Sequence, residues 1–416
     1  MTKNINKALV LIAGLFLFSS CQKKNESSVK PAEIKFSWWG TASRAEYTKL
    51  GLKIFKNLYP EISVLPQGYL WAGYEEMFDR QMKSGSTADV MQINYNWLYK
   101  YSPDGEGFFD LNQLSKYIDL NNFTSDELEY GTKNGVLNAI PIGFNTIVPI
   151  YNKSFLEKYG VDAPLTWEDL IAAGRKMKSD DVYVLGAAGK LTFLFVIACY
   201  EQYFDKKVFK NNRLNLSDSE MEDLFLIYKR FVENHVCLPC DEYTREIFIE
   251  SNNLAGVICW SNEISSYGNS INRKGSDYIL GNMPFKNHAK ESGFYIKPSM
   301  MYAIKKDTKN PEAAALLVDF LLNNGKMAIL QENERGVPVS NNSIASLLES
   351  GHLNSLEYTA SVQTRFKTSL TNKMLPIMED IKVINAFSLY GNAVAQGRLP
   401  LQDAAINFVK VIESVY

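Results

Sequence analysis

Residues 34–66 constrain the fold more than any other part of the chain. A run of apolar and strand-favouring residues, 34–40, ends in two adjacent tryptophans and a glycine, which is typical of a buried strand. Apolar residues then recur at spacings of three and four over 45–59, which predicts a helix that Pro60 ends. A second strand, 62–66, follows. The unit is therefore β-α-β, and its two strands should pair in parallel.

The same pattern continues with a predicted helix over 74–82 and a short buried strand within 88–97. Ligands of open α/β sheets bind beyond the carboxyl ends of the strands, so we expect the side chains at these ends to line a site. Aromatic rings beside amides suit flat, hydroxylated ligands. The candidates in this first part of the chain are Trp38, Trp39, Arg44, Trp71, Tyr74, Gln92, Asn94 and Trp97.

The first 21 residues have the features of an export signal. Two lysines precede an apolar run over 8–18, which is too short to span a bilayer but is typical of a signal core. Small residues directly before Cys21 resemble a bacterial lipoprotein cleavage site, although Phe18 stands where an aliphatic residue is usual. We expect a lipidated Cys21 followed by a flexible tether over 22–32. The alternative is an ordinary secreted protein with a free Cys21.

Composition agrees with a globular body of two domains. The chain has 416 residues, 46% of them hydrophobic and 22% charged. Its formal net charge is −2, so nucleic acid is not an expected partner. No apolar run after residue 20 has the length of a membrane span.

The remaining cysteines are predicted to have no chemical role. Cys237 and Cys240 have the spacing of a redox pair, but they follow a helical segment instead of starting one, and the only nearby further metal ligand is His235. A structural disulfide or plain thiols are expected for the set, which is Cys199, Cys237, Cys240 and Cys259. We predict no cofactor and no metal.

Two glycine-containing segments lack the spacing of nucleotide-binding loops. Residues 185–190 end in Gly-Lys but lack the first glycine and the Ser/Thr of a phosphate loop, and residues 105–107 lack the third glycine of a dinucleotide loop. Both are interpreted as ordinary loops. A helix over 167–177 is predicted after Thr166, which forms a capping pair with Asp169, and Trp167 is assigned to the core.

The order of Trp38-Trp39-Gly40, Arg44, Trp71 with Tyr74, and Asp89-Val90-Met91-Gln92 with Asn94 resembles the first lobe of the family 1 extracellular solute-binding proteins that serve carbohydrate importers of the ATP-binding cassette (ABC) type. The extended run 140–153, with two prolines and a final Tyr-Asn-Lys, resembles the first crossing between the lobes of that family. Residues 293–299 resemble the return crossing, and residues 335–339 resemble the third. The strand over 254–262, which ends in Trp-Ser-Asn, resembles the second-lobe surface of sugar binders.

This resemblance implies an α/β fold of the periplasmic-binding-protein type, in which two α/β lobes are joined by a three-segment hinge. The expected N-terminal lobe comprises 33–144 and 297–336, and the expected C-terminal lobe comprises 145–296 and 337–416. The ligand would bind between the lobes. The resemblance adds Asn145, Trp260, Asn262 and Lys297 to the candidate ligand-binding residues. Arg44 and Lys297 favour an anionic or partly anionic oligosaccharide.

The function implied is that of a monomeric, exported, membrane-anchored lipoprotein that captures a mono- or oligosaccharide and delivers it to an ABC permease, without catalysis. A peptide or polyamine ligand is an alternative, although a polyamine site would need acidic residues that the candidate set lacks. Presentation of the sugar to a sensor kinase is another. A carbohydrate-active enzyme would need two carboxylates about 5–10 Å apart, and Asp89 and Asp110 are interpreted as structural.

Overall fold

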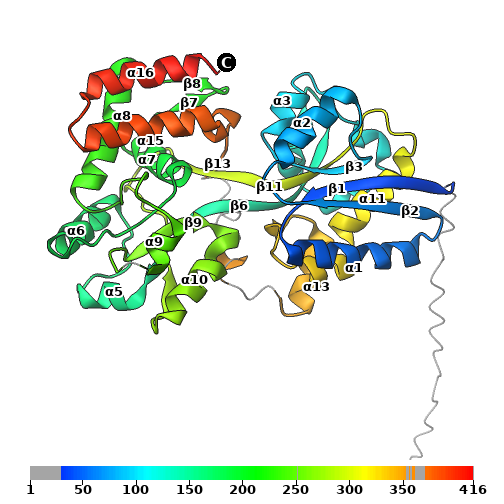
Figure 1. Cartoon of the computed structure of the whole chain (residues 1–416), viewed down its shortest axis with the longest axis horizontal. Helices are drawn as coiled ribbons and strands as arrows, with labels where there is room; N and C mark the ends of the chain where they lie inside the picture. Colours follow the sequence, from blue (N-terminus) through cyan, green and yellow to red (C-terminus); the bar gives the residue numbers. More distant parts are fainter. Residues whose placement is uncertain (1–29, 251, 353–355, 357, 361–370, 416) are drawn as a thin grey trace, which may run out of the picture.

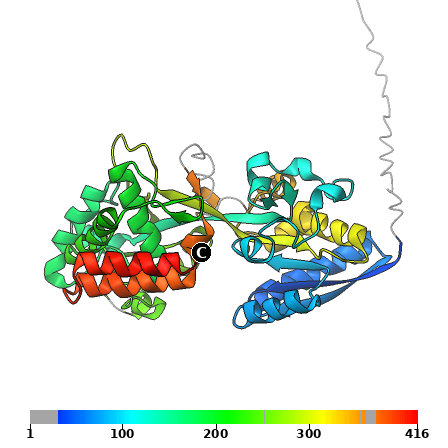
Figure 2. The same ribbon diagram turned by 90° about the horizontal axis from the view of Figure 1, so that it is seen from above.

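The chain folds around two main hydrophobic cores, which define two α/β lobes in this computed structural model (Figures 1 and 2). Residues 30–250, 252–352, 356, 358–360 and 371–415 are described. The N-terminal lobe contains β1 (Ala32–Trp39), α1 (Ala42–Leu58), β2 (Ile62–Tyr69), α2 (Tyr74–Ser84), β3 (Val90–Ile93), α3 (Trp97–Tyr101), α4 (Ser125–Glu129), α11 (Pro311–Asn323), α12 (Gly325–Gln331), β12 (Val337–Pro338) and α13 (Asn341–Glu349). The C-terminal lobe contains α5 (Lys153–Lys158), α6 (Trp167–Met177), α7 (Gly189–Phe204), α8 (Asp218–Glu233), α9 (Arg245–Glu250), β9 (Gly256–Trp260), η4 (Ser261–Glu263), α10 (Ile264–Arg273), β10 (Tyr278–Leu280), β13 (Thr371–Lys373), η6 (Pro376–Glu379), α15 (Ile381–Ala395) and α16 (Leu401–Glu413).

The predicted β-α-β unit is confirmed. Strand β1 pairs in parallel with β2 over its whole length, with Trp39 opposite Tyr69, and also pairs in parallel with β3. The carboxyl ends of β1, β2 and β3 therefore meet at one edge of the N-terminal lobe. Helix α1 lies on one side of these strands, and α2 and α3 lie on the other (Figure 1).

Two long strands, β6 (Ala139–Asn152) and β11 (Phe294–Ile304), run through both lobes side by side (Figures 1 and 2). They pair with each other in antiparallel fashion, and β11 continues the N-terminal sheet through β3. In β6, Phe144 belongs to the N-terminal core, whereas Ile147 belongs to the C-terminal core. In β11, the same change of core occurs between Ile296 and Tyr295.

The third crossing lies later in the chain than residue 337, where we predicted it. Strand β12 pairs with Gly143 and Phe144 of β6, on the N-terminal side, and Val339 packs in the N-terminal core. Helix α13 follows within the same lobe and packs against α12. Ala360 already packs in a cluster of the C-terminal lobe with Val148 and Leu254, and β13 then pairs with Phe294–Ile296 of β11. The predicted boundary was wrong because the family resemblance ended before α13.

Helix starts follow the local sequence closely. Thr166 caps α6 and forms a capping box with Asp169, as predicted. Trp167 is fully buried and donates from its indole Nε1 to Gln202 (3.0 Å), which confirms its core assignment. Asp89 is structural as well, because its carboxylate accepts from the Lys35 amide (2.8 Å) and from the Thr308 hydroxyl (2.6 Å).

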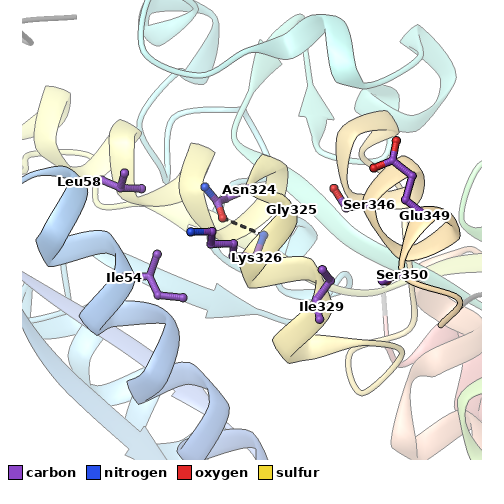
Figure 3. A pocket seen from close by; sticks show the side chains of 9 residues that line it. All are labelled: Ile54, Leu58, Asn324, Gly325, Lys326, Ile329, Ser346, Glu349 and Ser350. Carbon is purple, nitrogen blue, oxygen red and sulfur yellow. Dashed lines mark hydrogen bonds between the residues drawn. The ribbon is translucent and has the colours of Figure 1, made fainter. Parts of the chain in front are cut away.

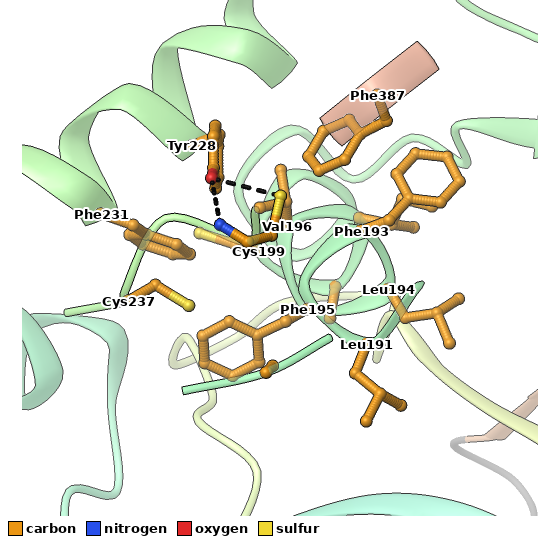
Figure 4. Close-up of a cluster of buried hydrophobic side chains, with 14 of the residues drawn as sticks. Leu191, Phe193, Leu194, Phe195, Val196, Cys199, Tyr228, Phe231, Cys237 and Phe387 are labelled. Atoms are coloured by element: carbon orange, nitrogen blue, oxygen red, sulfur yellow. Dashed lines mark hydrogen bonds between the residues drawn. The ribbon is translucent and has the colours of Figure 1, made fainter. Parts of the chain in front are cut away.

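The core of the C-terminal lobe is built around α7, whose aromatic side chains pack against α8 and α15 (Figure 4). Phe193 and Phe195 are fully buried, and the Tyr228 hydroxyl accepts from the amide of Cys240 (3.1 Å). The four described cysteines are buried free thiols. Burial raises the pKa of the Cys237 thiol to about 12, so this thiol stays protonated at neutral pH.

The predicted signal peptide with Cys21, and the tether as far as residue 29, lie outside the described residues. Strand β1 already begins at Ala32, the last residue assigned to the tether. Among the described residues, no single helix is long and apolar enough to cross a membrane.

Candidate ligand-binding site

An aromatic cluster occupies the edge at which β1, β2 and β3 end. The ring of Trp39 lies 5.2 Å from Trp71, 5.2 Å from Tyr74 and 5.8 Å from Trp97, measured between centroids. Trp71 and Trp97 are nearly parallel, with an interplanar angle of 14°. Trp97 and Tyr74 are 1% exposed and Trp39 is 8% exposed, whereas Trp71 is 48% exposed. Trp71 therefore offers a face to a ligand, and the other rings hold it in place.

Trp38 does not share this surface. Successive side chains of a strand point to opposite faces, so Trp38 points away from Trp39. It stacks on Phe36 (5.0 Å) beneath Gly68 and is 1% exposed. The structure therefore places Trp38 in the core, which removes the physical basis for its predicted role as a stacking surface.

Gln92 and Tyr74 connect the aromatic cluster to the backbone and side chains of the strands by hydrogen bonds. The amide of Gln92 donates to the Trp39 carbonyl (3.3 Å), and its oxygen accepts from Nε of Arg335 (3.0 Å). Arg335 is fully buried and also donates to Gln331 and Thr48. The Tyr74 hydroxyl lies 3.3 Å from both Ser37 Oγ and the Gln92 carbonyl. These polar groups already have protein partners, so they position the strand ends.

Arg44 is similarly engaged within the N-terminal lobe. Its guanidinium donates to the carbonyls of Trp39 (3.3 Å) and Glu334 (2.6 Å), which ties the start of α1 to the loop before β12. Burial and the positive charge of Arg335 lower the pKa of Arg44. Asn94 is partly buried, and its side-chain oxygen accepts from the Tyr95 amide (2.9 Å).

Trp260 ends β9 in the C-terminal lobe and is partly exposed. Its backbone amide donates to the carboxylate of Glu263 (3.1 Å), which fixes the turn into η4. Two ammonium groups lie over its ring, those of Lys297 at 5.0 Å and Lys190 at 5.4 Å from the centroid. The predicted residue Asn262 follows in η4 and is partly buried.

Lys190 and Lys297 share one carboxylate, that of Glu379. Oε1 of Glu379 accepts from Lys297 Nζ (2.6 Å) and also pairs with Lys190 Nζ. The Glu379 side chain is only 3% exposed. Burial alone raises the pKa of this carboxyl, but the two lysines outweigh it and lower the pKa to about 2. Burial and the charge of Lys297 lower the pKa of Lys190 to about 8.

Asn145 lies directly opposite Lys297 in the pairing of β6 with β11, so the two side chains share a face of the sheet. Asn145 is 8% exposed, and its side-chain oxygen has no protein partner among the described residues. Two positions further along β6, Ile147 lies opposite Trp260. Asn145, Lys297 and Trp260 are therefore neighbours on one face.

The two halves of this region approach each other across β6 and β11. Burial and the neighbouring Tyr99 raise the pKa of Tyr95 in the N-terminal lobe, and the charge of Glu379 adds to the shift. Lys373 of β13 lies over the ring of Tyr130 (5.0 Å), which belongs to the N-terminal lobe. Tyr95 and Tyr130 of the N-terminal lobe thus lie close to Glu379 and Lys373 of the C-terminal lobe.

A pocket of about 520 Å³ lies elsewhere, between α1, α12 and α13 (Figure 3). Ile54 and Leu58 line one wall, and Ser346 and Glu349 line the other. None of the predicted ligand-binding residues lines it. Among the described residues, no group of three or more His, Cys, Asp or Glu side chains could hold a metal ion.

Residues 39–328 match the family model described as bacterial extracellular solute-binding protein. The chain belongs to this family. This solute-binding protein is similar to a periplasmic oligogalacturonide-binding protein from Yersinia enterocolitica, solved with saturated digalacturonic acid, at 28% identity over 92% of this chain and 98% of that chain (TM-score 0.82). It is also similar to a periplasmic solute-binding protein from Pectobacterium atrosepticum, with 28% identity, the same coverage and a TM-score of 0.84.

The solute-binding protein also matches a de novo designed cysteine esterase, with 27% identity over 93% of this chain and all of that chain (TM-score 0.84). That activity belongs to a designed protein and is no evidence of catalysis here. The family confirms the expected fold of two α/β lobes and indicates an exported protein, periplasmic or extracellular, that binds a solute.

Sequence reasoning missed two charged members of the site. Lys190 was assigned to an ordinary loop, but it stands in the first turn of the 16-residue helix α7. The signal was present in part, because a long apolar run begins directly after Lys190. Glu379 had no comparable signal, since it ends the short helix η6, whose other residues are apolar and buried.

Proposed function

We propose that this protein is the substrate-binding lipoprotein of an ABC-type carbohydrate importer. It captures a sugar or oligosaccharide between its lobes and delivers it unchanged to the permease. Closure would occur about β6 and β11, the two described strands that pass from one core to the other. The monomeric state and the membrane anchor belong to the same proposal.

One observation carries the proposal: each lobe has an at least partly exposed tryptophan in the region where its strands end. Trp71 is 48% exposed on the N-terminal side, and Trp260 is partly exposed on the C-terminal side. Sugar rings have apolar faces that stack on indoles and hydroxyl rims that need hydrogen bonds. We assign stacking to Trp71 and Trp260, and hydrogen bonding to Asn94, Asn145 and Asn262.

The similarity to an oligogalacturonide-binding protein from Yersinia enterocolitica supports a carbohydrate over a peptide or polyamine. The hydrogen-bonding amides and indoles fit the same class. A micromolar complex needs about −8 kcal/mol, and several neutral hydrogen bonds at about 1 kcal/mol each plus two stacked rings reach that range.

The anchor is inferred from the signal features before Cys21. Lipidation there would leave fewer than a dozen residues between the membrane and β1, which begins at Ala32. The lobes would then stay close to the permease. Mass spectrometry of the mature protein tests this part, with Cys21→Ser as the control that should be released into the soluble fraction.

A thermal-shift panel of mono- and oligosaccharides, peptides and polyamines tests the ligand class. A ligand that binds the folded protein alone raises the melting temperature by mass action. We expect carbohydrates to raise it and to be recovered intact by chromatography. Stabilisation by peptides or polyamines only would overturn the carbohydrate assignment, and altered sugars would indicate an enzyme. Loss of sugar uptake after deletion of the gene separates an importer component from a sensor-kinase partner.

A further inference from the structure

The cluster beside Trp260 carries one positive charge without a carboxylate partner of its own. The ammonium groups of Lys190 and Lys297 both pair with the single carboxylate of Glu379, through the same oxygen. The three side chains are largely buried, being 25%, 11% and 3% exposed respectively. An unneutralised charge in such a place is costly unless a further partner binds.

The surroundings of the lysines suit an anion rather than a neutral group. Lys190 stands in the first turn of α7, where the helix dipole is positive, and the N-cap residue Ala188 supplies no side-chain cap. The ring of Trp260 stabilises the two ammonium groups only weakly, since a cation–π contact contributes about 0.5–2 kcal/mol. The buried oxygen of Asn145, on the same face, can accept from a ligand hydroxyl.

We propose that Lys190, Lys297 and Glu379, together with Trp260, form a subsite for one carboxylate of an acidic sugar. This inference rests on the proposed function and narrows it to uronate-containing ligands. Glu379 compensates one of the two lysine charges and leaves the net charge of the cluster at one, which matches a monoanionic carboxylate better than a doubly charged phosphate. Arg44 takes no direct part, because its guanidinium is already bound to two backbone carbonyls of its own lobe.

The same geometry predicts proton uptake on binding. Lys190 has a pKa of about 8 in the free protein, lowered by burial and by Lys297, whereas Glu379 opposes the shift. A bound carboxylate stabilises the charged form of Lys190 and raises its pKa. Binding at pH 8–9 should therefore take up a fraction of a proton, and affinity for the acid should fall as the pH rises through 8.

A matched pair of ligands tests the subsite on the unaltered protein. Digalacturonate and its methyl ester have the same rings but differ in charge. We expect the acid to bind at least about 10-fold more tightly by calorimetry, since a hydrogen bond to a charged group contributes more than a neutral one. The acid, but not the ester, should show a buffer-dependent enthalpy at pH 8.5, which reports proton uptake.

Variants then locate the effect. Lys190→Met and Lys297→Met should each weaken binding of the acid by about 10- to 100-fold and leave the ester within about 3-fold. Lys382→Met is the control, because Lys382 is exposed at the start of α15, next to Glu379. This variant should leave the affinity for both the acid and the ester unchanged. A disaccharide whose only charged group is a sulfate ester, if it bound more tightly than the uronate, would reassign the subsite to sulfate and overturn the assignment to a carboxylate.

The outcomes separate this inference from the proposed function. Equal affinity for acid and ester would remove the carboxylate subsite and leave a carbohydrate-binding protein. Equal losses for both ligands in the lysine variants would show a structural role for the lysines and would also remove it. Absence of binding to every carbohydrate of the panel would instead remove the proposed function. The ligand pair on the unaltered protein remains decisive if a variant fails to fold.

Discussion

The N-terminal half of the candidate site is aromatic and rests on hydrogen bonds, whereas the C-terminal half is an ion cluster beside one indole. Trp39 and Trp71 are supported by Gln92 and the fully buried Arg335. Trp260, by contrast, lies next to two lysines that share Glu379. Under the proposed function, we expect the first half to stack on the face of a sugar ring and the second half to respond to the charge of the ligand.

The largest expected effect is a loss of folding stability in the N-terminal half. Trp38→Ala should lower the free energy of unfolding by about 3–5 kcal/mol, since it removes a buried indole and leaves a cavity. Trp71→Ala removes an indole that is 48% exposed, so it should change the free energy of unfolding by less than about 1 kcal/mol. Urea denaturation measures both. Similar stability of the two variants would contradict the assignment of Trp38 to the core.

The next effect concerns the C-terminal half. Trp260→Ala should weaken carbohydrate binding by about 2 kcal/mol, or roughly 30-fold, because it removes the indole that lies beside both lysines. Isothermal titration calorimetry gives the affinity, and circular dichroism should show an unchanged fold. An unaltered titration would exclude Trp260 from the ligand surface.

The pH dependence sharpens the comparison, because Lys190 belongs to the C-terminal half. The pKa of Lys190 is lowered from 10.5 to about 8, chiefly by burial, so at this residue the unfolded chain binds more protons than the folded protein between these values. The contribution of Lys190 to the free energy of unfolding should therefore rise with pH across this window, by about 1–2 kcal/mol after allowance for partial exposure. Affinity for an acidic sugar should fall over the same range.

Thermal unfolding at pH 7.5 and pH 10, with and without the sugar, separates these two trends. Lys190→Met should remove the contribution of this residue to both of them. If unaltered protein and variant showed the same pH profile, titration of Lys190 would not be the cause.

The smallest effect tests the exposed ring of the N-terminal half. Trp71→Ala should weaken sugar binding by about 1 kcal/mol, or roughly 5-fold, since one face of the ring is available. Leu70→Ala is the matched control, because Leu70 is the preceding residue and is 71% exposed. Equal losses of affinity in the two variants would point to a general change in the loop.

The comparison also explains how far the sequence could predict the site. The N-terminal half comes from three strand ends within about sixty residues, in a parallel β-α-β arrangement that local periodicity reveals. The C-terminal half combines α7, β9, β11 and η6. Lys190 and Glu379 are 189 residues apart, and Lys297 and Glu379 are 82 apart. No local pattern links positions at such distances.

The third crossing was misplaced for a related reason. Residues 335–339 have the extended character of a connection, and β12 is indeed extended, but it pairs with β6 on the N-terminal side. An extended segment can join two lobes or add an edge to a sheet. Only its pairing partner distinguishes these cases.

The sequence alone determined the α/β class, the parallel pairing of the first strands and the capped start of α6, because these depend on spacing along the chain. Only the tertiary structure decided that Trp38 enters the core, whereas Trp39 joins the aromatic cluster at the strand ends. It also brought Lys190, Lys297 and Glu379 together. Burial and charge pairing depend on which elements pack against each other, and the periodicity of a single segment carries no information about its distant neighbours.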